Sequence, residues 1–113
     1  MKLIHKLNKS LYLELKDNHI PWSKITFGNG PRVEGILKHI ESEIEEVRAN
    51  PEDIREWIDI VILALDGAWR SGHSAEEVVL TLFDKLVKIR TRTYPKPEND
   101  DEPSMHIKNK ESV

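Results

Sequence analysis

Four acidic residues form two pairs with the same spacing. Glu43 and Glu46 are three positions apart, and so are Glu56 and Asp59. Residues three apart share one face of a helix, so each pair would present two carboxylates on the same side. If the two helices pack together, the four groups converge. Carboxylate oxygens suit hard cations such as Mg²⁺ or Mn²⁺ much better than Zn²⁺.

The second pair lies on a segment that is apolar around almost its whole circumference. Residues 57–65 are hydrophobic apart from Asp59, and we expect such a helix to be buried on most sides. Glu56, Asp59, Asp66 and Arg70 fall along one polar stripe of this helix. A buried carboxylate is costly unless it is paired or binds a cation. Glu-x-x-Glu is also common on solvated helices, but the joint pattern favours a metal site.

The elements that position these residues are predicted to be helices. Leucines four apart predict a first helix over residues 2–17, although Leu11, Leu13 and Leu15 also alternate as in a short strand. Residues 18–30 are rich in turn residues and predict a loop, anchored by the burial of Trp22 and Phe27.

Two further helices are predicted to form a hairpin around the acidic residues. Pro31 fits the first position of a helix over residues 32–48. Asn50 as the cap and Pro51 as the first residue start the next helix, over residues 51–70. The short link between these helices predicts antiparallel packing, with both acidic pairs near the turn.

The last predicted helix begins with a capping box. Ser74 and Glu77 have the spacing of this motif, and the helix is expected to end near Tyr94. We expect a single all-α domain over residues 1–94 and a disordered tail over residues 95–113, where apolar residues are scarce.

Composition excludes several functional classes. The 113 residues include no cysteine, which removes disulfides and thiolate metal sites. The longest apolar run, residues 60–65, is far too short for a membrane span. A net charge of −3 argues against a general nucleic-acid binder. The absence of cysteine fits a cytoplasmic protein, and a homo-oligomer is the expectation for so small a chain.

These motifs resemble a known family. Glu43-x-x-Glu46 followed by Glu56-Trp57-Ile58-Asp59 is similar to the ExxE…ExxD signature of the MazG-like all-α nucleotide pyrophosphohydrolases. Thr-Phe-Gly-Asn-Gly-Pro-Arg at residues 26–32, Gly-Ile-Leu-Lys-His-Ile at 35–40 and Leu-Ala-Leu-Asp-Gly-Ala-Trp-Arg at 63–70 resemble the dATP/dGTP (MazZ-like) branch, which includes phage enzymes.

The resemblance implies a fold and an activity. It implies a four-helix MazG-like bundle, assembled as a dimer or tetramer in a bacterial cell, with a phage as one source of the gene. The implied reaction is hydrolysis of dGTP or dATP to the monophosphate and pyrophosphate, in nucleotide pool control. Glu43, Glu46, Glu56 and Asp59 would hold two or more Mg²⁺ ions, with Mn²⁺ as a substitute. Glu46 is the first choice for the general base.

Other residues are candidates for contacts with the nucleotide. Lys85, Lys88 and Arg92 recur at helical spacing and could bind the phosphate tail, or form a solvated basic face. Ile89 stands where members of the family tend to carry Asn.

Further candidates lie nearer the acidic pairs. Asp66 and Arg70 would pair with each other, or Asp66 would take a metal. Arg32 could reach a phosphate, and His39 could orient a glutamate. Trp22, Trp57 and Trp69 could stack on a purine, although core or interface packing is the more common role of Trp57 and Trp69.

Two alternatives to a purine-specific enzyme remain open from the sequence. One is a related enzyme that removes a pyrimidine or damaged nucleotide, because the pocket lining is not readable from the motifs. The other is a non-catalytic helical oligomerisation module, in which the apolar helix over residues 51–70 would serve as an interface.

Overall fold

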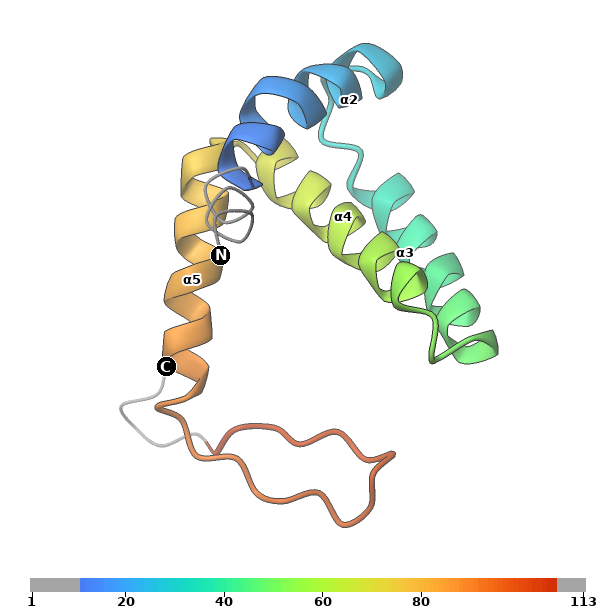
Figure 1. Cartoon of the computed structure of the whole chain (residues 1–113), viewed down its shortest axis with the longest axis vertical. Helices are drawn as coiled ribbons and strands as arrows, with labels where there is room; N and C mark the ends of the chain where they lie inside the picture. The colour runs from blue at the N-terminus through green and yellow to red at the C-terminus, as the bar shows by residue number, and fades with distance from the viewer. Residues whose placement is uncertain (1–10, 108–113) are drawn as a thin grey trace, which may run out of the picture. The chain divides into compact units, whose positions relative to one another are not determined.

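The computed structural model describes residues 11–107. These residues form helices and loops with no strand among them, which confirms the predicted all-α class (Figure 1). The predictions for residues 1–10 and 108–113 lie outside this range. The chain divides into two units, Met1–Val79 and Leu80–Val113, and each is described by itself.

The first unit is built around a helical hairpin. Helices α3 (Val33–Ala49) and α4 (Ile54–Arg70) lie side by side and run in opposite directions, as the short link predicted (Figure 1). Ile36 and Val47 of α3 are buried, and so is Trp69 of α4. A Cβ added to Gly67 of α4 would lie 3.9 Å from Ile36 Cγ2, so the space between the helices there would accept a methyl group.

Helix α4 begins three residues later than predicted. Asp53, not Asn50, is the N-cap, and its carboxylate accepts a hydrogen bond from the Arg55 backbone N–H at 3.0 Å. The Asn50 carbonyl instead accepts from the Asp53 N–H at 3.1 Å in a turn. Pro51 lies in this turn, and its carbonyl accepts a hydrogen bond from Trp57 Nε1 at 2.9 Å. The turn therefore connects α3 to α4, which Asp53 then caps.

The segment predicted as a loop over residues 18–30 is mostly helical. A π-helix, η1 (Glu14–His19), leads directly into α2 (Ile20–Phe27). Pro21 in this stretch has no N–H to donate and its ring crowds the preceding turn. The backbone widens just before it, where the Ile20 N–H reaches the Leu15 carbonyl. This wider turn lets the helix continue past a residue that was read as a break. Leu11, Leu13 and Leu15 are helical too, not extended.

Trp22 and Phe27 were predicted to be buried, but both are exposed. Their exposed fractions are 53% and 46%, and their rings meet edge to face at 5.7 Å. The guanidinium of Arg32 lies 4.8 Å from the Phe27 ring centre. The helical form of this segment turns the small residue Ser23 inward instead, and Ser23 is fully buried.

Two left-handed backbone positions define the connection from α2 to α3. Gly28 ends α2 at φ 87°, and Arg32 precedes Val33 at φ 52°. Arg32 is therefore the N-cap of α3. The helix begins at Val33, one residue later than predicted. A left-handed non-glycine residue is uncommon and is held here by its surroundings.

Helix α5 (Ala75–Ile89) carries the predicted capping box. The Glu77 backbone N–H donates to Ser74 Oγ at 3.1 Å, and the Ser74 N–H donates to the Glu77 carboxylate at 3.4 Å. The helix ends at Ile89 rather than near Tyr94, and residues 90–92 form turns. Arg92 consequently lies beyond the helix that was expected to carry it.

The second unit continues from α5 into an irregular loop. The Ile107 N–H donates to the Thr93 carbonyl at 2.7 Å, and the rings of Tyr94 and His106 lie 5.9 Å apart. These contacts join the two ends of the loop. The division into one domain over residues 1–94 and a disordered tail stays a prediction.

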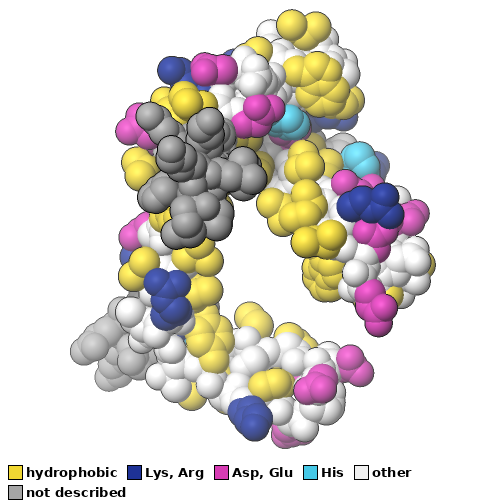
Figure 2. Space-filling view, in the orientation of Figure 1, with side chains coloured by type: hydrophobic (Ala, Val, Ile, Leu, Met, Phe, Trp, Pro, Cys, Tyr) yellow, Lys and Arg dark blue, Asp and Glu magenta, His cyan; other side chains and the backbone are white. Residues whose placement is uncertain are grey.

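The predicted burial of α4 on most sides is not met within the single chain. Trp57, Ile58, Val61 and Ile62 have exposed fractions of 41–51%. Hydrophobic side chains lie open along the hairpin in Figure 2. Among the described residues of the first unit, α3 packs along one side of α4 and these four side chains stay exposed.

The capping box allows a direct test of local stability. Ser74→Ala should lower the free energy of unfolding by about 1 kcal/mol, because the Glu77 N–H loses its acceptor. Ser74→Gly should lower the free energy of unfolding by only a few tenths of a kcal/mol, since glycine is tolerated at caps. Urea unfolding followed by circular dichroism measures both variants, and equal losses would contradict the capping role.

Candidate metal centre and nucleotide pocket

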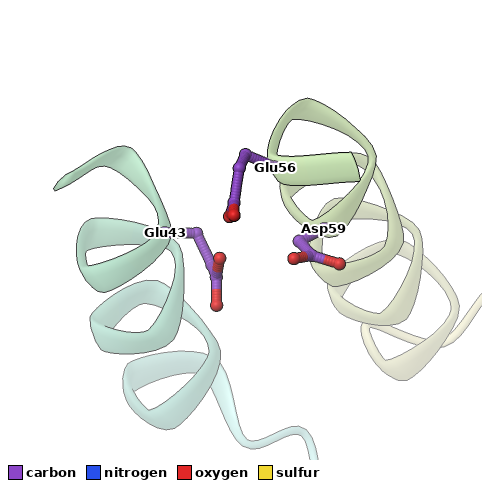
Figure 3. Close-up of side chains that lie close together, drawn as sticks. All are labelled: Glu43, Glu56 and Asp59. Carbon is purple, nitrogen blue, oxygen red and sulfur yellow. The ribbon is translucent and has the colours of Figure 1, made fainter. Parts of the chain in front are cut away.

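Three of the four predicted metal ligands converge. Glu43 of α3 and Glu56 and Asp59 of α4 each offer a carboxylate oxygen, and these oxygens lie within 4.8 Å of one another. Figure 3 shows the side chains pointing toward one another from the two helices. Glu43 and Glu56 are half-buried and Asp59 is exposed. Three hard oxygen donors at this spacing fit a divalent cation such as Mg²⁺ or Mn²⁺.

The electrostatics of Glu56 reflect this crowding. Partial removal from water raises the pKa of its carboxyl, and the neighbouring charges of Glu46, Asp53, Asp59 and Glu43 raise it further. Like charges held together disfavour ionisation unless a cation compensates them. The cluster therefore has the charge imbalance that a bound cation would relieve.

Glu46 and His39 lie at the edge of this cluster. Glu46 is exposed and is not one of the three converging groups, but its charge raises the pKa of Glu56. His39 Nε2 lies 3.3 Å from a Glu43 carboxylate oxygen, one helical turn away on α3. This contact fits the predicted role of His39 in orienting a glutamate.

A cavity of about 310 Å³ runs from the acidic cluster along the hairpin. Glu43 and Asp59 line it at the acidic cluster, and Asp66 lines it further along α4. Its remaining walls combine aromatic, aliphatic and basic side chains, among them Trp22, Phe27, Arg32, His39, Ile62 and His19. Such a mixture of apolar walls and a few polar groups is typical of small-molecule sites.

Asp66 binds three side chains rather than a lone partner. Its Oδ1 lies 2.7 Å from His19 Nε2 and accepts from Trp69 Nε1 at 3.1 Å, and its Oδ2 accepts from Ser23 Oγ at 3.1 Å. Asp66 is only 7% exposed. The buried carboxylate is thus satisfied by donors from the η1–α2 segment and from α4.

Arg70 does not form the predicted direct pair with Asp66. Its Nη1 donates to the carbonyls of Gly28 and Gly30, both at 2.8 Å, and its Nη2 donates to the carbonyl and hydroxyl of Ser23. Ser23 Oγ, which accepts from Arg70, donates in turn to Asp66. Arg70 is buried, and its hydrogen bonds hold the loop after α2 against α4. It therefore supports the pocket without lining it.

The predicted cationic stripe lies in the second unit. Lys85, Lys88 and Arg92 are exposed, and Lys88 Nζ pairs with Asp84 at 3.1 Å on the surface of α5. Trp57 donates to the Pro51 carbonyl and Trp69 donates to the Asp66 carboxylate. Neither ring lines this cavity, whereas Trp22 does.

Sequence reasoning missed His19 and Ser23. Both were read as part of a loop, because Pro21 lies between them. They are four residues apart, the spacing of neighbours on one helical face. A helix that continued through Pro21 would have placed both residues together, and that spacing was the available signal.

The fold and the site define the chain as an all-helical protein with a carboxylate cluster held between two antiparallel helices. A sequence model of the family described as dATP/dGTP pyrophosphohydrolase matches residues 15–113. The chain therefore belongs to the dATP/dGTP pyrophosphohydrolase family, which confirms the resemblance seen in its motifs.

A phage protein is among the relatives. The chain is 41% identical over 95 residues to the Eaa protein of Salmonella phage P22, and the match covers 83% of the chain but 29% of that protein. No solved structure matches. Within the described residues, no helix is long and apolar enough to cross a membrane.

The hydrogen bonds of Asp66 predict a graded response to substitution. Asp66→Ala should lower the free energy of unfolding by about 3 kcal/mol or more, because the buried donors of Trp69 and Ser23 lose their acceptor. Asp66→Asn should lower the free energy of unfolding by less, since one oxygen remains for Trp69 and the Ser23 hydroxyl can accept from the amide. Urea titration of both variants measures the difference, and equal losses would contradict the network.

The raised pKa of Glu56 predicts how cations and pH affect stability. A carboxyl whose pKa is raised on folding opposes folding when ionised, so the penalty is present at pH 7 and disappears below about pH 4. Metal-free Glu56→Gln should therefore melt no lower than wild type at pH 7, and any gap should close in acid.

The same variant should respond less to divalent cations. Millimolar Mg²⁺ or Mn²⁺ should raise the melting temperature of wild type by several degrees through binding to the folded state, and of Glu56→Gln by much less. Thermal melts with and without each cation measure this, and equal shifts for the two proteins would contradict a metal site at Glu56.

Proposed function

We propose that the chain is a Mg²⁺-dependent enzyme that hydrolyses dGTP and dATP to the monophosphate and pyrophosphate. The observation that carries the proposal is the convergence of the Glu43, Glu56 and Asp59 carboxylates from two helices. The family match supports the type of reaction, and the adjoining cavity supports a ligand of nucleotide size.

The carboxylates have a defined task in this reaction. Glu43, Glu56 and Asp59 would hold the cation, with Glu46 at the edge of the set, and two ions are expected. A bound divalent cation supplies charge neutralisation on the phosphates and lowers the pKa of a water molecule. His39 would keep the Glu43 carboxylate in its orientation through the contact at 3.3 Å.

The reaction breaks the bond between the α and β phosphates. Water adds to phosphorus, the pyrophosphate leaves, and one proton passes from the water to a base. We assign this base role to Glu46, because its carboxylate is exposed and lies close enough for its charge to raise the pKa of Glu56. Arg32 lines the cavity and would contribute a positive charge toward the substrate. We retain Lys85, Lys88 and Arg92 as candidates for the phosphate tail.

The cavity walls suit a base as well as phosphates. Trp22 and Phe27 offer aromatic faces, and Ile62 lies on the α4 side. Aromatic faces stack on any base, so they bind a nucleotide without selecting one. The purine preference in the proposal rests on the family.

We also propose that the enzyme is a homo-oligomer. Trp57, Ile58 and Val61 of α4 and, separately, Phe83 and Val87 of α5 are 45–57% exposed in the single chain. Rows of large apolar side chains on helices are typical of interfaces between subunits. A dimer or tetramer would cover them, and the cytoplasm, where nucleotide pools lie, is where we expect it to act.

The decisive assay is a panel of nucleoside triphosphates with Mg²⁺ or Mn²⁺ and separation of the products. Purine deoxynucleoside triphosphates should yield monophosphate and pyrophosphate. Asp59→Asn should reduce kcat/KM by about a thousandfold, because loss of a ligand removes several kcal/mol of transition-state stabilisation.

A matched control lies on the neighbouring helix. Glu45 is exposed and pairs with Arg48 at 2.6 Å, away from the cluster, so Glu45→Gln should retain full activity. Preferred turnover of a pyrimidine or damaged nucleotide would replace the purine assignment. Diphosphate and orthophosphate as products, or no turnover of any nucleotide, would overturn the proposed function. The non-catalytic oligomerisation module would then be the remaining alternative.

A further inference from the structure

We propose that His19 determines base specificity by accepting, at Nδ1, a hydrogen bond from an exocyclic amino group of the purine. The inference rests on the proposed function and names a residue that neither the motifs nor the family match assigns. It depends on the contact of His19 with Asp66, on the placement of His19 in the cavity, and on its distance from the acidic cluster.

The contact with Asp66 sets which ring nitrogen carries the hydrogen. An ionised carboxylate only accepts hydrogen bonds, so the short contact of 2.7 Å requires a hydrogen on His19 Nε2. The neutral ring then has a lone pair on Nδ1 and can only accept there. Among residues 11–107, no group donates to that nitrogen. Asp66 is itself fixed by Trp69 and Ser23, so the tautomer is held by buried contacts.

The ring is also accessible from the cavity. His19 lines the cavity together with Trp22, and the two rings lie 5.7 Å apart at a tilt of 42°. The side chain of His19 retains 23% exposure despite its contact with Asp66. It also ends the π-helix η1, and such irregular turns often occur at functional sites. The ring thus offers a fixed acceptor beside an aromatic face.

The spacing along α4 matches the length of a nucleotide. Asp59 and Asp66 are seven residues apart, which is about 10 Å along a helix. Phosphates at the carboxylates therefore leave room for a sugar and a base to extend toward His19. An acceptor at that place favours bases that carry an amino group, as adenine and guanine do.

The test compares substrates that differ only in that amino group. One pair is dATP and purine 2′-deoxyriboside triphosphate, which lacks the 6-amino group. The other is dGTP and dITP, which lacks the 2-amino group. In wild type, removal of the amino group should lower kcat/KM by about tenfold in at least one pair, because a buried acceptor is left unpaired.

His19→Lys should abolish this preference. The lysine ammonium can still donate to Asp66, so the fold is expected to persist, while no acceptor remains, because an ammonium group only donates. The ratio of kcat/KM within the affected pair should fall to about one, with hydrolysis of the amino-free analogue retained. His73→Lys is the matched control, because His73 contacts Glu77 at 3.1 Å and does not line this cavity. It should keep the wild-type ratio.

A second measurement covers the case in which His19→Lys does not fold. Histidine ¹⁵N spectra of wild type should show hydrogen on Nε2 of His19. Addition of dATP with an imido group between its α and β phosphates should shift the Nδ1 resonance, and the amino-free imido analogue should not.

Each outcome separates the inference from the proposed function. A ratio near one in wild type for both pairs, a ratio unchanged in His19→Lys, or hydrogen on Nδ1 would overturn the role of His19 while hydrolysis stands. No hydrolysis of any deoxynucleoside triphosphate by wild type would overturn the proposed function itself.

Discussion

The buried carboxylate of Asp66 organises the part of the molecule that shapes the pocket. It accepts from Trp69 on its own helix and from Ser23 on α2, and it contacts His19 of η1. A buried charge is tolerated only when such partners replace water. Because two of these partners come from another segment, the same interactions dock that segment onto α4. The wall of the pocket and the stability of the fold therefore depend on one side chain.

The acidic cluster and the Asp66 network place acidic groups of one α4 stripe in different surroundings. Glu56 and Asp59 of α4 lie beside Glu43 of α3, whereas Asp66 is stabilised by hydrogen-bond donors of the protein. Glu56 lies among other carboxylates, and partial removal from water together with their charges raises its pKa. An acid with protein donors is structural, whereas acids that crowd without donors are suited to an external cation. This contrast separates the roles of residues that share one face.

The sequence predicted the helical class and the hairpin, because both follow from periodicity and spacing on regular helices. It also named four acidic residues for one cluster, and three of them, Glu43, Glu56 and Asp59, converge in the structure. It failed where tertiary contacts override local signals. Pro21 suggested a break, yet the wider π turn before it lets the helix continue. Asn50 resembled a cap, but the turn that follows makes Asp53 the cap. The direct Asp66–Arg70 pair was wrong because Ser23, a small residue with no distinctive pattern, lies between the two charges.

The exposed apolar face of α4 connects the site to assembly. Asp59 and Ile62 line the cavity, while Ile58, Val61 and Trp57 lie open on the same helix. A surface that covered these side chains would also restrict the motion of α4 and lower the local dielectric beside the carboxylates. Electrostatic attraction to a cation strengthens when water is excluded. Self-association, as proposed above, would therefore strengthen the binding of a cation at the acidic cluster.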